Sequence, residues 1–126
     1  MRRPGSLAEV ADAAIDRTAF QFALAEFLDQ FSIDQSSDML SREPDMLADR
    51  FPAGDVCDAY LAAVAVALAR DIRATPPAWS WQEGRKLRRP WFAHPGAALR
   101  ATLLLESPAP FRERNLFVSA NALSRA

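Results

Sequence analysis

The chain has 126 residues, half of them hydrophobic and a quarter charged, with a formal net charge of −1 at pH 7. At about 100–200 residues per domain, residues 1–126 are predicted to form one domain, large enough to fold without disulfides or a metal. The single cysteine, Cys57, excludes an internal disulfide framework and is typical of a reducing cytoplasm. The longest apolar run, 59–69, is shorter than the ~20 residues that cross a bilayer, and no secretory signal is evident. We therefore expect a bacterial-type cytoplasmic protein with no membrane contact.

Charge is distributed unevenly along the chain. Residues 1–60 contain twelve acidic residues and five arginines, a net charge of −7, whereas residues 61–126 contain ten cations and four acidic residues, a net charge of +6. Either the two halves face each other or solvate separate surfaces, or a basic surface of the second half attracts an anionic partner. Fourteen of the fifteen cations are arginine, which suits bidentate contacts to carboxylate or phosphate, although GC-rich codon usage gives the same ratio.

Two patterns predict helices in the first third of the chain. Ser6 and Glu9 have the spacing of a capping box, which predicts a helix over 7–16 after a disordered segment at 1–6. A second apolar stripe has helical spacing and consists of Phe20, Leu24, Phe27, Leu28 and Phe31. At ~100° per residue the two stripes point about 85° apart. A break between the two helices is therefore expected at 16–18.

The next segment, 32–54, is polar and is predicted to be an irregular connector. It contains two short helical candidates, at 36–42 and at 45–50 after Pro44. Helices this short are marginal in water without tertiary contacts. Neither candidate is therefore expected to be stable alone.

Two segments rich in alanine and leucine are predicted to form the interior. Residues 56–72 have no charged face in their middle and are predicted to be a buried central helix capped by Gly54 or Asp55. Residues 95–106 form the second helix, with Pro95 preorganised for its first turn. If both are buried, only arginine and aromatic side chains outside them remain to bind a partner.

Proline and tryptophan punctuate the rest of the chain. Two consecutive prolines in 75–84 rule out a continuing helix, which predicts an ordered loop. Glu106 opposes the helix dipole, so we expect it to pair with Arg112 or Arg114 and to fold the tail, 107–126, against the helix ends; an unpaired, exposed Glu106 is the alternative. The predicted fold is all-α: an irregular helical bundle of four to five helices with ordered Pro/Trp-rich loops and a partly extended C-terminal tail.

No catalytic or metal-binding pattern is evident. His94 is the only histidine, which excludes a His-pair metal site and a Cys-His zinc site. Cys57 and His94 are conceivable as nucleophile and base, but a cysteine in an apolar helix is usually a small core residue. The four glycines are scattered and form no phosphate loop. We expect no enzyme activity, no catalytic residue, no metal and no cofactor.

The densest basic cluster, 85–89, lies among tryptophans. Its arginines are explained by solvation or internal pairing, by a protein interface, where Trp and Arg dominate, or by nucleic-acid binding with base stacking. The two apolar helices do not suit the DNA major groove. The candidate partner-binding residues are Arg85, Lys86, Arg88, Arg89, Trp91, Phe111, Arg112, Arg114 and Phe117.

Residues 89–126 resemble a group of small bacterial proteins. The resemblance lies in Arg-Pro-Trp-Phe at 89–92, Ala-Leu-Arg-Ala at 98–101, Glu-Ser-Pro at 106–108 and Phe-Arg-Glu-Arg-Asn-Leu-Phe-Val at 111–118. The group accompanies nucleotidyltransferase-like proteins in antitoxin-like pairs. The resemblance implies a non-catalytic protein-binding partner, the antitoxin-like or regulatory member of a two-gene module, with a nucleotidyltransferase-like protein as a possible partner and no functional residue to carry over. The alternative is a nucleic-acid-binding regulator that uses Arg85 to Arg89.

Overall fold

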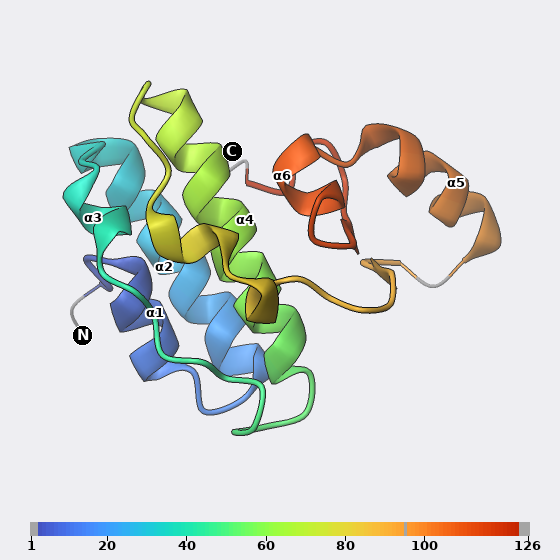
Figure 1. Cartoon of the computed structure of the whole chain (residues 1–126), viewed down its shortest axis with the longest axis horizontal. Helices are drawn as coiled ribbons and strands as arrows, with labels where there is room; N and C mark the ends of the chain where they lie inside the picture. Colours follow the sequence, from blue (N-terminus) through green and yellow to red (C-terminus); the bar gives the residue numbers. More distant parts are fainter. Residues whose placement is uncertain (1–2, 95, 124–126) are drawn as a thin grey trace.

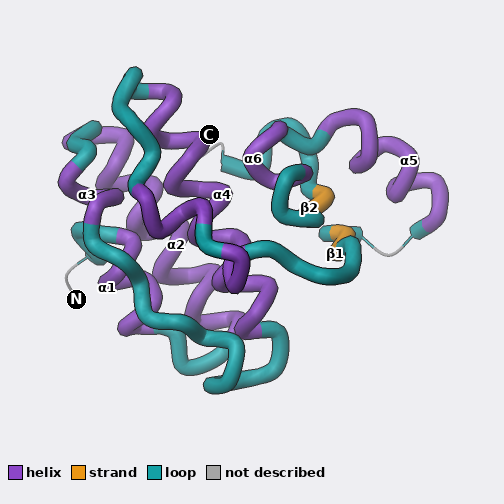
Figure 2. Tube along the Cα trace, in the orientation of Figure 1, coloured by secondary structure: helices purple, strands orange, loops and turns teal. Residues whose placement is uncertain are grey.

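A computed structural model describes residues 3–94 and 96–123. The predicted all-α irregular bundle is confirmed: α1 to α4 pack together, α6 packs against α4, and α5 lies at one end of the long axis (Figure 1). Figure 2 shows that the strands are the only extended pairing in the described part of the chain. The elements are α1 (Leu7–Ala13), α2 (Arg17–Asp34), α3 (Asp38–Ser41), α4 (Gly54–Asp71), the 3-10 helices η1 (Ala78–Trp81) and η2 (Glu83–Arg85), β1 (Trp91–Phe92), α5 (Ala97–Glu106), α6 (Ala109–Arg112) and β2 (Leu116–Phe117).

The predicted capping box at the start of α1 is confirmed. The Ser6 hydroxyl accepts a hydrogen bond from the Glu9 amide at 3.2 Å, and the Glu9 carboxylate accepts one from the Gly5 amide. The first bond satisfies an amide that the first helical turn leaves without a partner, and the second ties the residue before the N-cap, Gly5, to the helix. Of the segment 1–6, which is expected to be disordered, the structure describes residues 3–6, where Arg3 pairs with Glu26 at 3.2 Å; residues 1 and 2 lie outside the described part.

The predicted break between the first two helices is also confirmed, although α1 ends earlier than expected, at Ala13. Asp16 then adopts an extended backbone and its carboxylate accepts a hydrogen bond from the Ala19 amide at 2.7 Å. Because Asp16 caps a new helix rather than continuing the old one, both apolar stripes turn inward, and all five residues of the second stripe are buried.

Helix α4 is the buried centre, as predicted. It is packed against four elements: α2, η1, η2 and α6. Because these cover most of its surface, the helix has no charged face toward water. Aromatic rings link the layers: Tyr60 of α4 meets Phe20 and Phe111 edge-on, with ring centroids 6.3 and 5.0 Å apart. The fully or nearly buried residues of α4 are Gly54, Cys57, Asp58, Ala59, Leu61, Ala62, Ala63, Val64, Ala65, Val66, Leu68 and Ala69.

The connector before α4 is fastened to it by Asp58. The Asp58 carboxylate, completely buried, accepts hydrogen bonds from the amides of Leu47 at 2.7 Å and Ala48 at 2.9 Å. Gly54 permits this approach, because a Cβ there would lie 1.9 Å from the Leu47 carbonyl oxygen. The predicted cap by Gly54 or Asp55 is wrong. The residue before the first turn of α4 is Ala53, which has a left-handed backbone conformation, and no side chain caps the helix.

Of the two short helical candidates in the connector, one forms. Residues 38–41 become α3 within the predicted 36–42. Residues 45–50 do not form a helix and end instead in a turn at 48–50. Asp58 accepts hydrogen bonds from two consecutive amides of this stretch, which fastens it to α4 in its non-helical path.

The segment after α4 forms the ordered loop expected over 75–84. Trp79 is buried, and its indole N–H donates to the Leu40 carbonyl oxygen at 3.1 Å, which joins η1 to α3. Trp81 is 45% exposed and lies against the guanidinium of Arg114, 5.1 Å from its ring centroid. One tryptophan is therefore a core residue and the other covers a buried charge.

The tail folds back, but by a different bond from the predicted one. Ser107, just after α5, accepts a hydrogen bond from the Val118 amide at 2.6 Å and donates to the Val118 carbonyl at 3.0 Å. The tail is partly extended, as expected, and β2 pairs with β1 in parallel. Within the described residues Glu106 is exposed and has no ion pair, so the predicted pairing with Arg112 or Arg114 is wrong.

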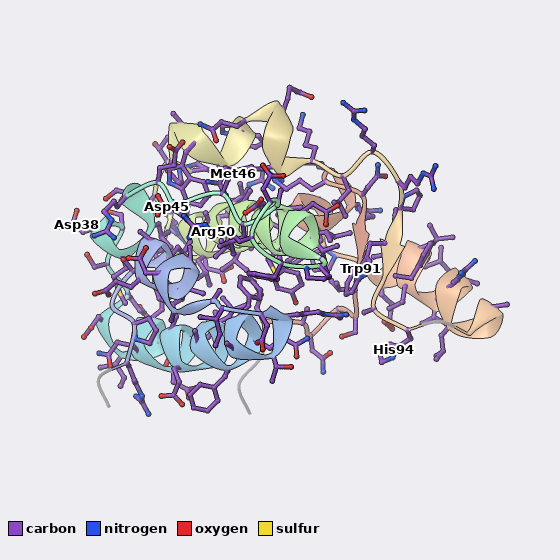
Figure 3. The ribbon with its side chains drawn as sticks, turned by 90° about the horizontal axis from the view of Figure 1, so that it is seen from below. Asp38, Asp45, Met46, Arg50, Trp91 and His94 are labelled. Atoms are coloured by element: carbon purple, nitrogen blue, oxygen red, sulfur yellow. The ribbon has the colours of Figure 1, made fainter. Side chains whose placement is uncertain are left out.

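The prediction that 95–106 is buried is wrong. In the described part of α5, the only buried side chain is that of Leu103. Phe111 of α6 and the residues of β2 pack against α4, whereas α5 contacts β2. Helix α5 is therefore displaced outward, as both Figure 1 and Figure 3 show; Pro95 itself lies outside the described residues.

Candidate functional site

Three of the predicted partner-binding residues are buried. The side chains of Arg85, Phe111 and Arg114 are 0–1% exposed, so their placement on a binding surface is wrong. Burial lowers the pKa of both arginines, while Asp58 and Glu43 act in the opposite direction on Arg85.

Each buried arginine is held by backbone carbonyls and a tryptophan face. Arg85 donates to the Pro44 carbonyl and lies 4.9 Å from the Trp79 ring centroid. Arg114 donates to the carbonyls of Pro110 at 2.7 Å and Ser80 at 2.8 Å. A planar guanidinium both stacks on a ring and donates several hydrogen bonds at its edge. These two arginines therefore join loops distant in sequence rather than contact a partner.

The other predicted residues remain accessible. Lys86, Arg88, Arg89 and Arg112 are exposed, and Lys86 pairs with Glu83 at 3.3 Å. The two remaining aromatic candidates, Trp91 and Phe117, are half-buried. Trp91 is covered by the Arg17 guanidinium, 5.2 Å from its ring centroid, and Phe117 stacks on Phe92 at 5.0 Å.

The basic segment borders a hollow of mixed charge. Its lining includes Lys86, Arg88 and Arg89, and with them Asp55, Glu83 and Glu113. A nucleic-acid backbone in this hollow would meet three carboxylates as well as three cations, and that repulsion opposes the phosphate contacts on which such binding depends.

Helix α5 has an exposed apolar face. Ala97, Ala101, Leu104 and Leu105 are exposed and follow the i, i+4, i+7, i+8 spacing of one helix face; we call them the α5 stripe. Leu105 is 85% exposed and Leu104 is 48% exposed. The spacing is visible in the sequence, but the whole helix reads as apolar, so only the structure shows which face is uncovered.

A cavity of about 360 Å³ lies between α2, α4, β1 and the tail. Cys57 and His94 both line it, so the structure brings the one cysteine and the one histidine to the same cavity. In Figure 3, His94 lies near Trp91, at the end of the molecule that carries α5. Sequence reasoning missed this cavity, because its walls come from residues far apart along the chain.

The Cys57 thiol does not have the properties of a nucleophile. It is 2% exposed, and burial, reinforced by Asp58, raises its pKa to about 12. Because the thiolate is the reactive form, almost no reactive species exists near neutral pH.

We therefore expect Cys57 to react with a disulfide reagent at pH 8 at less than about one hundredth of the rate of a free thiol, whose pKa is about 8.5. The measurement is the absorbance of the released thiolate, with the same protein in denaturant as the control. Fast modification of the folded protein would contradict the burial of this thiol.

Other site types find no support in residues 3–94 and 96–123. That part of the chain contains no group of three or more His, Cys, Asp or Glu side chains arranged to hold a metal. None of its helices combines the length and the apolar character needed to cross a bilayer. The α5 stripe and the cavity are therefore the two candidate binding sites.

Comparison with known proteins adds no further candidate: no protein-family model, no curated protein and no solved structure matches this chain.

Proposed function

We propose that this protein is a non-catalytic cytoplasmic binding protein that docks another protein through α5. The observation that carries the proposal is the α5 stripe, an apolar helix face that the rest of the described chain leaves uncovered. Exposed apolar patches on a folded domain mark interaction surfaces more often than isolated exposed residues do. The role as antitoxin-like or regulatory member of a two-gene module is part of this proposal and draws on the resemblance at 89–126, which includes α5.

The charges near α5 suggest the chemistry of the partner. Arg100 lies four residues before Leu104 on the same side of the helix, and its guanidinium stacks on Phe92, 5.1 Å from the ring centroid. Arg88, Arg89 and Arg112 are exposed on the flanking segments. The partner surface that complements these groups has an apolar groove for the helix and an acidic rim. An acidic protein is therefore favoured over a nucleic acid, which offers no apolar groove for leucines.

The decisive variant is Leu105→Lys. Its side chain contacts little of its own chain, so the free energy of unfolding should change by less than about 0.5 kcal/mol. Ile15→Lys is the matched control, because Ile15 is 80% exposed but lies between α1 and α2. We expect the wild-type protein, tagged in its native host, to copurify with one acidic protein in a fixed ratio, and the two purified proteins to bind each other.

In that reconstituted pair, Leu105→Lys should weaken the affinity at least about tenfold, as loss of a central apolar contact does, and Ile15→Lys should leave it unchanged. Three results overturn the proposal: a monomer without a stoichiometric partner, a homodimer that Leu105→Lys dissociates, or a copurifying nucleic acid whose binding falls steeply as salt rises. Equal effects of the two variants would also overturn it.

A further inference from the structure

The cavity between α2, α4 and the tail is separate from the α5 stripe and has the build of a small-molecule site. Its volume of about 360 Å³ lies at the lower end of the range of ligand pockets, about 300–1,000 Å³. The apolar wall is contributed mainly by α2 and α4. Its members are Phe20, Leu24, Ala25, Leu28 and Val56.

The side chains with hydrogen-bond donors that line the cavity include those of Arg17, Gln21, Tyr60 and His94. Within the described residues none of these four side chains forms a hydrogen bond or an ion pair, and the Arg17 guanidinium lies over the ring of Trp91. Donors that converge on one cavity without an acceptor from their own chain are available to a ligand. Arg17, Gln21 and His94 are exposed, so water satisfies these donors in the free protein. An oxygen-rich group on a ligand would replace that water.

The charge of the cavity selects an anion. No aspartate or glutamate lines it, and Arg17 is its one full charge. Arg17 sits in the first turn of α2, where a cation is disfavoured by the helix dipole. The carboxylate at that helix end, Asp16, accepts from the Ala19 amide and does not line the cavity. An anionic group bound beside Arg17 would neutralise its charge and complement the positive end of the helix.

The field of Arg17 also extends to the apolar wall. Arg17 acts to lower the pKa of Cys57, against the stronger effect of burial. The nearby carboxylates of α4 act in the opposite sense, but they point elsewhere: Asp58 binds the Leu47 and Ala48 amides, and Asp55 lines the hollow beside the basic segment. Cys57 and Tyr60 both have raised pKa values because they are buried, so neither adds a negative charge at neutral pH.

We propose that this cavity binds a small amphipathic carboxylate. The carboxylate lies against the Arg17 guanidinium, within reach of Gln21 and His94, and the apolar body lies along Leu24 and Leu28. Because the tail supplies Val118 and Ser119 to the same lining, the bound molecule also contacts the segment that Ser107 holds in place.

The test compares octanoate with octanol on the full-length protein by isothermal titration calorimetry. Octanoate should bind and octanol should bind at least about tenfold more weakly, because only the carboxylate forms charge-assisted hydrogen bonds. Arg17→Gln should weaken octanoate binding by about tenfold or more. Arg50→Gln is the control, because Arg50 is exposed, pairs only with Asp45, and lies at the opposite end from Trp91 and His94 (Figure 3).

A second variant locates the binding. Ala25→Phe places a ring in the apolar part of the cavity and should abolish octanoate binding in a protein whose circular dichroism spectrum is unchanged. If Ala25→Phe does not fold, the Arg17 and Arg50 variants decide alone. The proposal is overturned if octanoate does not bind at millimolar concentration, if octanol binds equally well, if Arg17→Gln and Arg50→Gln behave alike, or if a folded Ala25→Phe retains binding. None of these results bears on the α5 stripe.

Discussion

Replacing Arg114 with alanine is expected to lower the free energy of unfolding by about 3 kcal/mol or more, the range for breaking a buried hydrogen-bond network. The carbonyls of Pro110 and Ser80 would lose their donor, and Trp81 would lose the guanidinium beneath it. Arg112→Ala is the control: the same residue type two positions earlier, but exposed, with an expected change below about 0.5 kcal/mol.

Arg114→Lys should also be destabilising, because one ammonium cannot reproduce the planar fork that reaches two carbonyls. The measurement is urea unfolding followed by tryptophan fluorescence and circular dichroism. If Arg114→Ala left stability unchanged but abolished partner binding, Arg114 would be a binding residue, as its sequence context predicts. The structural role described above would then be wrong.

Asp58→Ala is expected to cost a comparable amount, about 3 kcal/mol, because it leaves the amides of Leu47 and Ala48 without an acceptor inside the protein. The loss should also release the connector that Asp58 holds against the start of α4. Asp55→Ala is the matched control: it removes a carboxylate one turn earlier on the same helix, but an exposed one, and should cost no more than about 1 kcal/mol through the helix dipole.

Chemical denaturation gives the size of the Asp58 effect, and amide hydrogen exchange shows its place. Exchange should accelerate first at Leu47 and Ala48 in Asp58→Ala and remain slow there in Asp55→Ala. Asp58→Asn retains one carbonyl acceptor and should fall between the two. Equal effects of the Asp58 and Asp55 substitutions would mean that the carboxylate contributes only to the helix dipole.

These two predictions bear on function because they separate structural charges from available ones. With Arg85 and Arg114 buried, the accessible basic residues near α5 are Arg88, Arg89 and Arg112, together with Arg100 on the helix itself. The proposed protein-binding surface therefore has fewer arginines and more apolar side chains than the sequence suggests. The leucines of the α5 stripe become the residues to test first.

Local sequence patterns were enough to predict most of the helices. The Ser6–Glu9 capping box, the apolar stripe at 20–31 and the uncharged middle of α4 depend on residues within a few turns of each other, and periodicity and capping report on that range. The same holds for the break before α2. The all-α bundle and its buried central helix followed from these patterns alone.

Tertiary structure decided which apolar and charged groups are accessible. The composition of α5 shows that the helix is apolar but does not show whether its own chain covers it, and it is α6 and β2 that pack against α4. Arg85 and Arg114 have polar sequence neighbours, as exposed residues do. They are nevertheless buried, and they donate hydrogen bonds to the carbonyls of Pro44, Ser80 and Pro110. The cavity likewise joins α2, α4, β1 and the tail. Burial depends on contacts between segments distant along the chain, which no short-range pattern encodes.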